Sequence, residues 1–347
     1  MKRACSCRRA AAILTATTLA ALAFTTCDDF NRPLKEEIGF YLSVTPVSTW
    51  AELKSAAEGL TGPDLIGLAA DITPGSTDTA ISITRPLTIT AFEGSRTIRR
   101  EGATPFTGSF FTVDGGDLTL GHPQGGSLIL DGGADNGTTV GPLVRVNSGR
   151  LTVNSGVTLR NNSIAAGSGG GVHVMGIGST FTMSGGTISG NTATAGYGGG
   201  GGVYVNSGDF TMDGGTISGN TVSDTGWGGG VYVYDGAFTM SGGIIGGNTA
   251  GYGGGVFVES DFIMSGGTIS GNTTSFDGGG VYVYDGSFSK TGGVIFGDTD
   301  RIHTPGSDEN TAASGSGHAA YMFGGLKRNS TAGPDVNLNS STSENWE

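Results

Sequence analysis

One seven-residue string constrains the fold of this chain more than any other feature. GGTISGN occurs at 185–191, again at 214–220 and again at 266–272, and the near copy GGIIGGN lies at 242–248. The string is rich in glycine, but it recurs too often for a phosphate-binding loop, and no strand–loop–helix pattern surrounds it. A string that returns at a regular spacing indicates a structural repeat.

The repeat unit is 24 to 30 residues long and opens on a large apolar residue. A period of this size is typical of a solenoid, in which each unit contacts only its neighbours. The opening residues are Leu151, Phe181, Phe210, Phe238, Phe262 and Phe288.

Three short segments within each unit carry the pattern of β-strands. They have the forms Phe-Thr-Met, Thr-Ile-Ser and Val-Tyr-Val, and each is bounded by Gly, Asn, Asp or Ser. Strands this short are stable only when they pair with their copies in the units above and below, at about 4.8 Å. The sequence therefore predicts an all-β fold: a right-handed, three-sheet parallel β-helix of about eleven rungs, where a rung is one complete turn of the coil.

Alternation along each strand assigns one Phe, one Met and one Ile per unit to the inside of the coil, together with the flanking valines. Asparagine recurs ten residues after the opening residue. An amide at the same place in every rung favours a hydrogen-bonded ladder at a turn, although a ligand-binding role is the alternative. The ladder residues are Asn191, Asn220, Asn248 and Asn272, with Asn161 and Asp298 in the flanking units.

The chain outside the repeats divides into further segments. We expect a signal peptide at 1–26, a lipid-anchored tether at 27–47, a short N-terminal capping helix at 48–62, the β-helix at 63–335 with its clearest repeats at 149–300, and a polar tail at 336–347. The helix is predicted from a capping box formed by Thr49 and Glu52. Such a helix covers the first rung, whose unpaired edge would otherwise recruit other strands.

The N-terminal segment predicts export. A basic stretch, MKRACSCRR, precedes an apolar run of about 15 residues that is too short and too rich in alanine for a good membrane span. Cys27 follows this run in a setting that resembles a bacterial lipobox, which implies a lipid anchor at the outer membrane or cell surface. Ordinary cleavage after Ala23 is the alternative, and it would release a secreted or periplasmic protein.

Charge excludes one class of partner. The formal net charge is −12, and the first 26 residues hold four bases and no acids, so without them the net charge is −16. Nucleic acid and anionic membrane surfaces need a basic footprint, so we expect no nucleic acid and no membrane contact besides the lipid anchor. All three cysteines lie within the first 27 residues, so no disulfide framework supports the fold.

Two short motifs in the units resemble the repeats of polymorphic outer membrane proteins. One is a GG-aliphatic-aromatic run, found at 201–204, 229–232, 254–257 and 279–282. The other is an F-x-x-N run, in which Ile replaces Phe, as in Ile188 to Asn191 and its copies. The resemblance covers residues 149–300 and implies a surface-displayed β-helix of adhesin type.

Aromatic residues outside the predicted core are the candidates for binding. If the valines of Val-Tyr-Val point inward, the rings point outward in columns that suit stacking on sugars or contact with a protein. The loops between the second and third strands vary in length and carry one aromatic each. In the alternatives, the rings stack only on one another, the strand phase is reversed, or the loop aromatics fold over their own rungs. The candidates are Tyr204, Tyr232, Tyr234, Phe257, Tyr282 and Tyr284 in the columns and Tyr197, Trp227, Tyr252 and Phe276 in the loops.

Catalysis on this fold needs clustered carboxylates, or aspartates that bind a metal beside an Arg or Lys base. The repeats supply few acids, and the best cluster is the segment 298–303, with Asp300 and His303. We therefore expect no enzyme, no cofactor and no metal. The first hypothesis is a monomeric, lipid-anchored, adhesin-like protein that binds a glycan or an extracellular protein. A polysaccharide lyase or glycoside hydrolase is the second, and a passive surface spacer is the third.

Overall fold

The computed structural model of the chain describes residues 39–102, 105–133, 141–165, 167–194, 198–296, 310–313 and 320–322. The chain divides into two compact units, Met1–Thr45 and Pro46–Glu347. Residues 39–45 are the described part of the first unit, and the predicted signal peptide, Cys27 and the polar tail lie outside the described residues. Among the described residues, no helix is long and apolar enough to cross a membrane.

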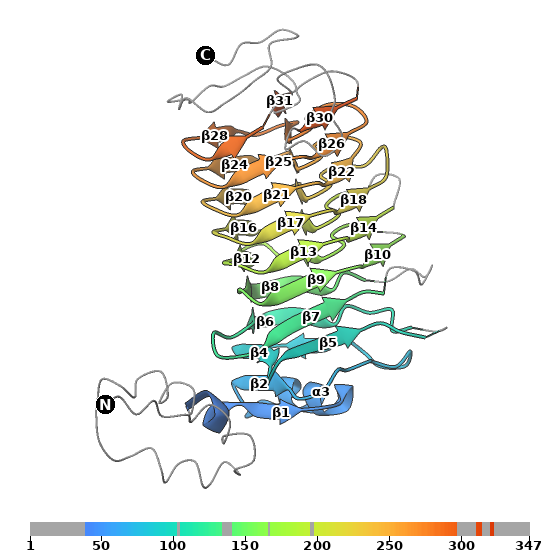
Figure 1. Ribbon diagram of the computed structural model, residues 1–347, viewed down its shortest axis with the longest axis vertical. Coiled ribbons are helices and arrows are strands. Elements are labelled where there is room, and N and C mark those ends of the chain that lie inside the picture. The colour runs from blue at the N-terminus through green and yellow to red at the C-terminus, as the bar shows by residue number, and fades with distance from the viewer. Residues whose placement is uncertain are drawn as a thin grey trace, which may run out of the picture. The chain divides into compact units, whose positions relative to one another are not determined.

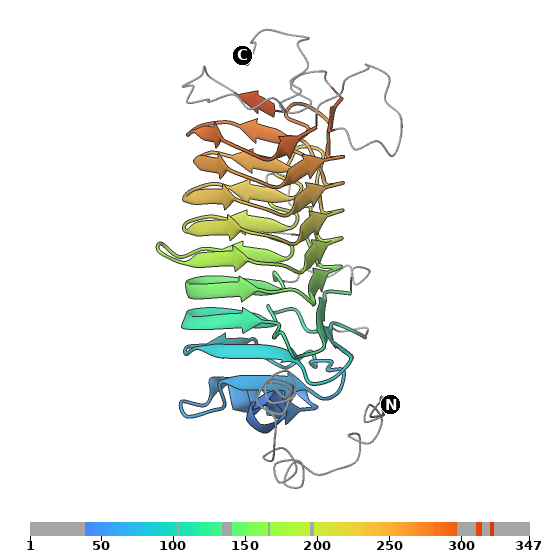
Figure 2. The same cartoon turned by 60° about the vertical axis from the view of Figure 1, so that its left-hand side comes forward.

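The second unit is a coil of short strands that pair in parallel from one rung to the next (Figures 1 and 2). Two of its three sheets are built from one strand per rung. The eight-stranded sheet contains β5 (Ser95–Arg99), β7 (Ser127–Asp131), β9 (Val157–Arg160), β13 (Thr187–Ser189), β17 (Thr216–Ser218), β21 (Ile244–Gly246), β25 (Thr268–Ser270) and β29 (Val294–Ile295). The six-stranded sheet contains β10 (Ser163–Ile164), β14 (Thr192–Ala193), β18 (Thr221–Val222), β22 (Thr249–Ala250), β26 (Thr273–Thr274) and β30 (Thr311–Ala312).

The large sheet takes two segments from each rung. In β6 and β8 one ten-residue strand supplies both segments, whereas in later rungs a tight turn divides them into two strands. Its strands are β1 (Thr45–Val47), β2 (Leu65–Leu68), β3 (Ile81–Ile83), β4 (Leu87–Ala91), β6 (Phe111–Leu120), β8 (Val144–Val153), β11 (Val172–Val174), β12 (Thr180–Met183), β15 (Val203–Val205), β16 (Asp209–Met212), β19 (Val231–Val233), β20 (Ala237–Met240), β23 (Val256–Val258), β24 (Asp261–Met264), β27 (Val281–Val283), β28 (Phe288–Lys290) and β31 (Ala320–Met322).

The predicted three-sheet parallel β-helix is confirmed, but with fewer rungs than expected. The smaller sheets hold six and eight strands among the described residues, which corresponds to about seven rungs instead of eleven. The difference lies upstream of the repeats, where two strand segments of the large sheet belong to a single rung. Ile81 pairs with Phe111 and Leu87 pairs with Leu118, so β3 and β4 both lie beside β6 and belong to one rung.

The core is stacked by residue type in the repeated rungs. The phenylalanine rings that open successive units lie parallel, with centroids 4.6–4.9 Å apart and interplanar angles of 3–13°. Like residues therefore stack on like residues, as alternation predicted. Fully buried beside the rings are Met183, Met212, Met240 and Met264, and then Ile188, Ile217, Ile245 and Ile269.

Helix α3 (Trp50–Glu58) lies at the start of the coil and packs against β2 and β3. Thr49 caps the helix by accepting a hydrogen bond from the Glu52 backbone N–H at 3.2 Å. Leu53 and Ala57 are buried on the inner side, and the indole of Trp50 lies 5.7 Å from the ring of Phe106. The helix ends at Glu58, four residues before the predicted boundary at 62.

Candidate binding surface

The aromatic residues between the paired valines form one column on the outer side of the large sheet. Strands β15, β19, β23 and β27 pair in register, so Tyr204, Tyr232, Phe257 and Tyr282 lie one above another. Val203, Val231, Val256 and Val281, which precede them, are fully buried in the coil. The valines therefore point inward and the rings point outward.

This column is not the exposed strip of rings that the sequence predicted. Tyr232, Phe257 and Tyr282 are 2–5% exposed and form a second apolar cluster outside the coil. Neighbouring ring centroids are 5.0 Å apart for Tyr204–Tyr232 and 4.9 Å apart for Phe257–Tyr282. The expected exposure is therefore wrong for these three residues, and the rings stack on one another instead.

The variable loops bury the column. Trp227 lies 5.9 Å from Tyr232 and 6.0 Å from Phe257 between ring centroids, and Tyr252 lies 5.5 Å from Tyr282. These two loop aromatics fold back over the rungs, which was one of the alternatives at the sequence level. The loops thus shield apolar rings from water, and such burial stabilises the fold.

Glycine lets the loops approach the rings this closely. At Gly199 a Cβ would lie 2.0 Å from Cδ1 of Tyr232, so any side chain there would force the loop away from the ring. The loops also pair with one another: the Gly200 N–H donates to the carbonyl of Trp227 at 2.9 Å, and the Gly228 N–H donates to that of Tyr252 at 3.0 Å. The glycine-rich segments therefore allow the loops to pack directly on the aromatic column.

Two tyrosines remain exposed at the edge of the column. Tyr234 is 50% exposed and Tyr284 is 48% exposed, and they follow β19 and β27 directly. Glu259 holds the same position after β23, on the rung between them. We call these three residues the tyrosine ridge. Phe276, which is 38% exposed and stacks on Tyr252 at 4.8 Å, is an exposed loop candidate outside the ridge.

The buried column holds the ridge in place. Tyr234 meets Tyr232 edge to face at 6.4 Å between centroids, and Tyr284 stacks on Phe257 at 6.3 Å. The Tyr232 hydroxyl donates to Oε1 of Glu259 at 2.6 Å. Because the backbone N–H groups of all three ridge residues also bond to the preceding rung at 2.8 Å, the ridge has a fixed geometry.

The column tyrosines stay protonated across the physiological pH range. Burial raises the pKa of Tyr204 to about 12. Burial, followed by the hydrogen bond to Glu259, raises the pKa of Tyr232 much further, and burial also raises that of Tyr282. A protonated Tyr232 is a constant donor to Glu259, so this carboxylate keeps its orientation.

Several predicted functional residues cannot be placed in this geometry. Tyr197, Cys27 and the acidic segment 298–303 lie outside the described residues. The binding candidates that the structure brings together on an accessible surface are therefore Tyr234 and Tyr284, and Glu259 joins them.

The asparagines form a hydrogen-bonded ladder inside the coil. The backbone N–H and Nδ2 donate to Oδ1 of the asparagine in the next rung, at 2.8–3.0 Å, in Asn191, Asn220, Asn248 and Asn272. Nδ2 also donates to a backbone carbonyl of the preceding rung. For Asn191 this is the carbonyl of Leu159, at 3.2 Å. All of these side chains are fully buried, so a ligand has no access to them.

Both ends of the ladder differ from the prediction. In the early unit Asn162 is the ladder residue, because one more residue lies between Val153 and Thr158 than between their register partners Met183 and Thr187. Asn161 instead adopts the left-handed conformation at φ 54° that Gly190 adopts in the next rung. At the far end Asn310 takes the place expected for Asp298. The string Asn-Thr-Ala at 310–312 repeats that at 191–193 and was the available signal.

Arg100 ends the ladder and was not predicted from the sequence. Its Nη1 donates to Oδ1 of Asn162, and its Nη2 donates to the carbonyls of Gly108 and Gly141. The guanidinium lies 4.7 Å above the ring of Phe110 and is 1% exposed. Burial lowers the pKa of Arg100 to about 10. Alternation was the available signal: Arg100 is two residues after the buried Ile98, whereas Arg99 is exposed.

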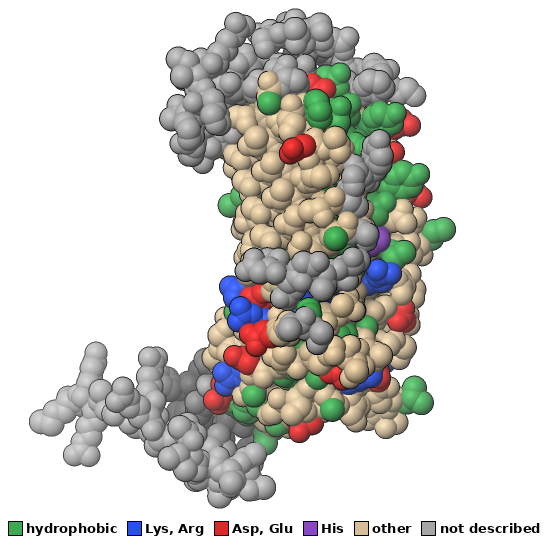
Figure 3. All heavy atoms as spheres, turned by 90° about the vertical axis from the view of Figure 1, so that its right-hand side faces the viewer, with side chains coloured by type: hydrophobic (Ala, Val, Ile, Leu, Met, Phe, Trp, Pro, Cys, Tyr) green, Lys and Arg blue, Asp and Glu red, His purple; other side chains and the backbone are tan. Residues whose placement is uncertain are grey.

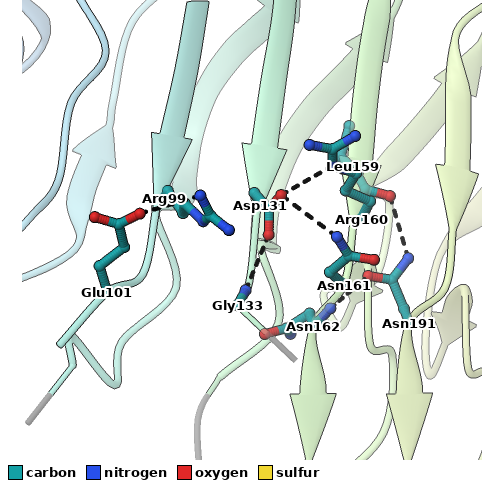
Figure 4. Close-up of polar contacts among 9 residues, drawn as sticks. All are labelled: Arg99, Glu101, Asp131, Gly133, Leu159, Arg160, Asn161, Asn162 and Asn191. Atoms are coloured by element: carbon teal, nitrogen blue, oxygen red, sulfur yellow. Dashed lines mark hydrogen bonds and ion pairs between the residues drawn. The ribbon is translucent and has the colours of Figure 1, made fainter. Parts of the chain in front are cut away.

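Asp131 is the buried carboxylate nearest to a catalytic arrangement in the described part of the chain (Figure 4). Its Oδ2 accepts from Nε of Arg160 at 2.9 Å and from Asn161 at 3.4 Å, and its Oδ1 accepts from the Gly133 N–H at 3.1 Å. Both oxygens are engaged by the protein itself. The arrangement is that of a structural ion pair across two rungs, in which the carboxylate ties β7 to β9.

No group of three or more His, Cys, Asp or Glu side chains that could hold a metal ion occurs among the described residues. Residues 147–311 match the family model for a right-handed β-helix region. No curated protein and no solved structure shows significant similarity to the chain. The matched segment covers the repeated rungs, the loops and the tyrosine ridge. The match extends over 165 of the 347 residues and agrees with the parallel β-helix that the structure shows.

Proposed function

We propose that this chain is an exported, non-enzymatic β-helix protein that binds a glycan or an extracellular protein through the tyrosine ridge. The observation that carries the proposal is a pair of half-exposed tyrosines, Tyr234 and Tyr284, on either side of Glu259. Most apolar aromatic surface on this side of the coil is covered by loops, whereas these two rings are left accessible. Exposed aromatic rings with a polar group between them are typical of recognition surfaces.

Rigidity supports the same proposal. The ridge residues are fixed by backbone hydrogen bonds and by contacts with the buried column. A surface that is already ordered loses little side-chain entropy when it binds, which leaves more of the contact energy as affinity. Weak single contacts repeated along a rigid coil also suit a long ligand.

We further propose that the protein is anchored to the cell envelope by a lipid on Cys27. The support is the sequence: a basic stretch, an apolar run and then a cysteine followed by two aspartates. Metabolic labelling with a fatty acid tests the anchor. The wild-type protein should take up the label and Cys27→Ala should not, while an unlabelled wild-type protein would refute it.

A polysaccharide lyase or hydrolase is the competing function. The buried Asp131 does not support this function, because both of its carboxylate oxygens already accept hydrogen bonds from the protein. Asp300 and His303 are the residues through which it would act. The test is the release of new reducing ends from neutral and acidic polysaccharides: cleavage that is lost in Asp300→Asn or His303→Gln would overturn the non-enzymatic proposal.

Binding is tested with the purified wild-type protein, an immobilised glycan panel and extracellular matrix proteins. The double variant Tyr234→Ala/Tyr284→Ala should lose retention, whereas Leu60→Ala should keep it. Leu60 is 92% exposed and lies on the chain after α3, far in sequence from the ridge, so it controls for the loss of any exposed apolar side chain. If wild type and double variant bind equally, the ridge is not the site. If the wild type binds nothing, the spacer hypothesis is favoured.

A further inference from the structure

The stretch between Arg160 and Lys290, which covers most of the repeated rungs, is acidic. Between Arg160 and Lys290 the chain has neither lysine nor arginine. The same stretch has eight acids, which are Asp209, Asp213, Asp224, Asp235, Glu259, Asp261, Asp277 and Asp285. On the face shown in Figure 3, the Lys and Arg side chains gather over the lower rungs, and the charged side chains of the upper rungs are acidic.

Five of these carboxylates lie in the turns that carry the tyrosine ridge and in the equivalent turn of the preceding rung. The turns that join the two segments of the large sheet, at 206–209, 234–237, 259–261 and 284–287, lie on four successive rungs. Asp235 and Asp285 directly follow the two exposed tyrosines and are themselves exposed. Asp209 and Asp261 bond to the next rung, to the Ala237 N–H and the Ser287 hydroxyl respectively. The fifth carboxylate is that of Glu259, so the ridge combines aromatic rings with a concentrated negative charge.

We propose that the ligand of the ridge is an extended glycan with free amino groups that lies along the coil axis, one sugar per rung. This inference rests on the proposed function and specifies its ligand. Charge complementarity selects a cationic partner, since the ridge repels anionic polysaccharides. Oε1 of Glu259 accepts a hydrogen bond from the Tyr232 hydroxyl. Oε2 has no hydrogen-bond partner among the described residues, so it can accept a hydrogen bond from an ammonium group of the ligand.

The spacing of the rings favours a glycan over a basic peptide. Successive rungs are about 4.8 Å apart, so Tyr234 and Tyr284, two rungs apart, are separated by about 10 Å. A β-1,4-linked sugar advances its chain by nearly one rung, and alternate sugars present the same face. In an extended peptide, side chains on one side repeat at about 6.6–6.8 Å and do not match the rungs.

The proposed contacts follow from this register. The first and third sugars stack on Tyr234 and Tyr284, and the amine of the second meets the carboxylate of Glu259. An ammonium group near the faces of the tyrosines gains a further attraction from the rings. Three sugars are therefore the shortest glycan that reaches every ridge residue.

Calorimetry with matched oligosaccharides tests the inference. The pairs are β-1,4-linked glucosamine and N-acetylglucosamine oligomers of two, three and four sugars, which differ in the amine alone. The glucosamine trimer should bind the full-length protein about tenfold or more tightly than the acetylated trimer, because a charge-assisted hydrogen bond is worth about 1.5–3 kcal/mol. Affinity should rise steeply from dimer to trimer and little from trimer to tetramer, and the preference should weaken with added salt.

Variants separate the amine contact from the stacking contacts. Glu259→Gln keeps an acceptor for the Tyr232 hydroxyl and should abolish the preference for amine while leaving binding of the acetylated trimer unchanged. Tyr234→Ala should weaken both trimers alike. Asp213→Asn, outside the ridge turns but in the same rungs, should change neither. Melting temperatures of the variants close to that of the wild type would verify that they fold.

Three outcomes overturn parts of the proposal, and each can be recognised. Equal affinity for both trimers, with the Tyr234→Ala loss intact, overturns the cationic ligand but leaves the proposed function standing. Binding of oligolysine in place of either trimer replaces the glycan by a basic polypeptide. Binding of no oligosaccharide, peptide or matrix protein overturns the proposed function itself.

Discussion

The rungs before Arg160 and the rungs after it are held together in different ways, although one continuous coil contains both. In the early rungs the core residues vary from rung to rung, strands reach ten residues, and both bases and acids are present. In the late rungs the same residues return at the same positions. Every ion pair found between described residues belongs to the early part: Lys54–Glu58, Arg85–Asp64, Arg99–Glu101, Arg150–Asp117 and Arg160–Asp131.

The difference shows how a coil can tolerate an uncompensated charge. Acids along the late rungs repel one another, and Lys290 is the one lysine or arginine among the described residues that follow Arg160. Stacked phenylalanines and a buried amide ladder stabilise these rungs, and neither involves a charged group. The late rungs can therefore present an acidic surface to a partner, whereas the early rungs use their charges within the fold.

The largest expected effect is at the stacked rings. Phe238→Ala should lower the free energy of unfolding by about 3–5 kcal/mol, because it opens a cavity in a fully buried core. Phe210→Ala should cost the same within about 0.5 kcal/mol, since both rings lie between two other phenylalanines and rung energies add along a solenoid. Urea unfolding measures both, and clearly unequal losses would show that the late rungs are not equivalent.

The amide ladder should follow. Asn220→Ala leaves the Asn191 side-chain and backbone donors and the Ile188 carbonyl without their partner, which should cost about 2–4 kcal/mol. Asn154→Ala in the early rungs removes one partly buried bond, to the Gly121 carbonyl, and should cost about 1 kcal/mol. Comparable losses in the two variants would contradict the view that the ladder acts as a connected network.

His173 lies where the two regions meet, next to Arg145 on one side and Tyr204 on the other. Burial, with the positive charge of Arg145 as a second cause, lowers the pKa of His173 to about 4. In the unfolded chain this histidine binds a proton near pH 6.5, whereas in the folded chain it binds one only near pH 4. Protonation therefore favours the unfolded chain, and the free energy of unfolding should decrease as the pH falls from about 6.5 to about 4.

The expected loss is about 1–3 kcal/mol between pH 7 and pH 4. His173→Phe keeps a ring in the column and should remove this part of the acid sensitivity. Urea midpoints of the two proteins at pH 7 and pH 4.5 provide the measurement. An identical decrease in both would mean that His173 does not titrate in this range.

Period and alternation alone predicted the fold and the inward columns, because each Phe, Met or Ile repeats with a fixed phase. The rung count and the ladder ends were misjudged where spacing is irregular: one extra residue between Val153 and Thr158 moves the ladder from Asn161 to Asn162. The burial of Tyr232 was beyond sequence reasoning, since it depends on where a loop of variable length brings Trp227. The partners of Arg100 were missed for a similar reason, because two of the three, Gly141 and Asn162, are 41 and 62 residues away in the chain.

The smallest expected effect concerns the ion pairs of the early rungs. Arg99 and Glu101 are each about half exposed and lie 3.1 Å apart, so Arg99→Ala should change stability by at most about 0.5 kcal/mol, an effect that salt should remove. Arg160→Ala removes the partner of the buried Asp131 and should lower the free energy of unfolding by a larger amount, about 1–2 kcal/mol. Unfolding at low and high salt distinguishes the two. A large, salt-sensitive loss in Arg99→Ala would mean that exposed charges hold the early rungs together. A small loss would mean that the varied apolar core stabilises the early rungs. Both regions would then be stabilised by their cores, and they would differ mainly in surface charge.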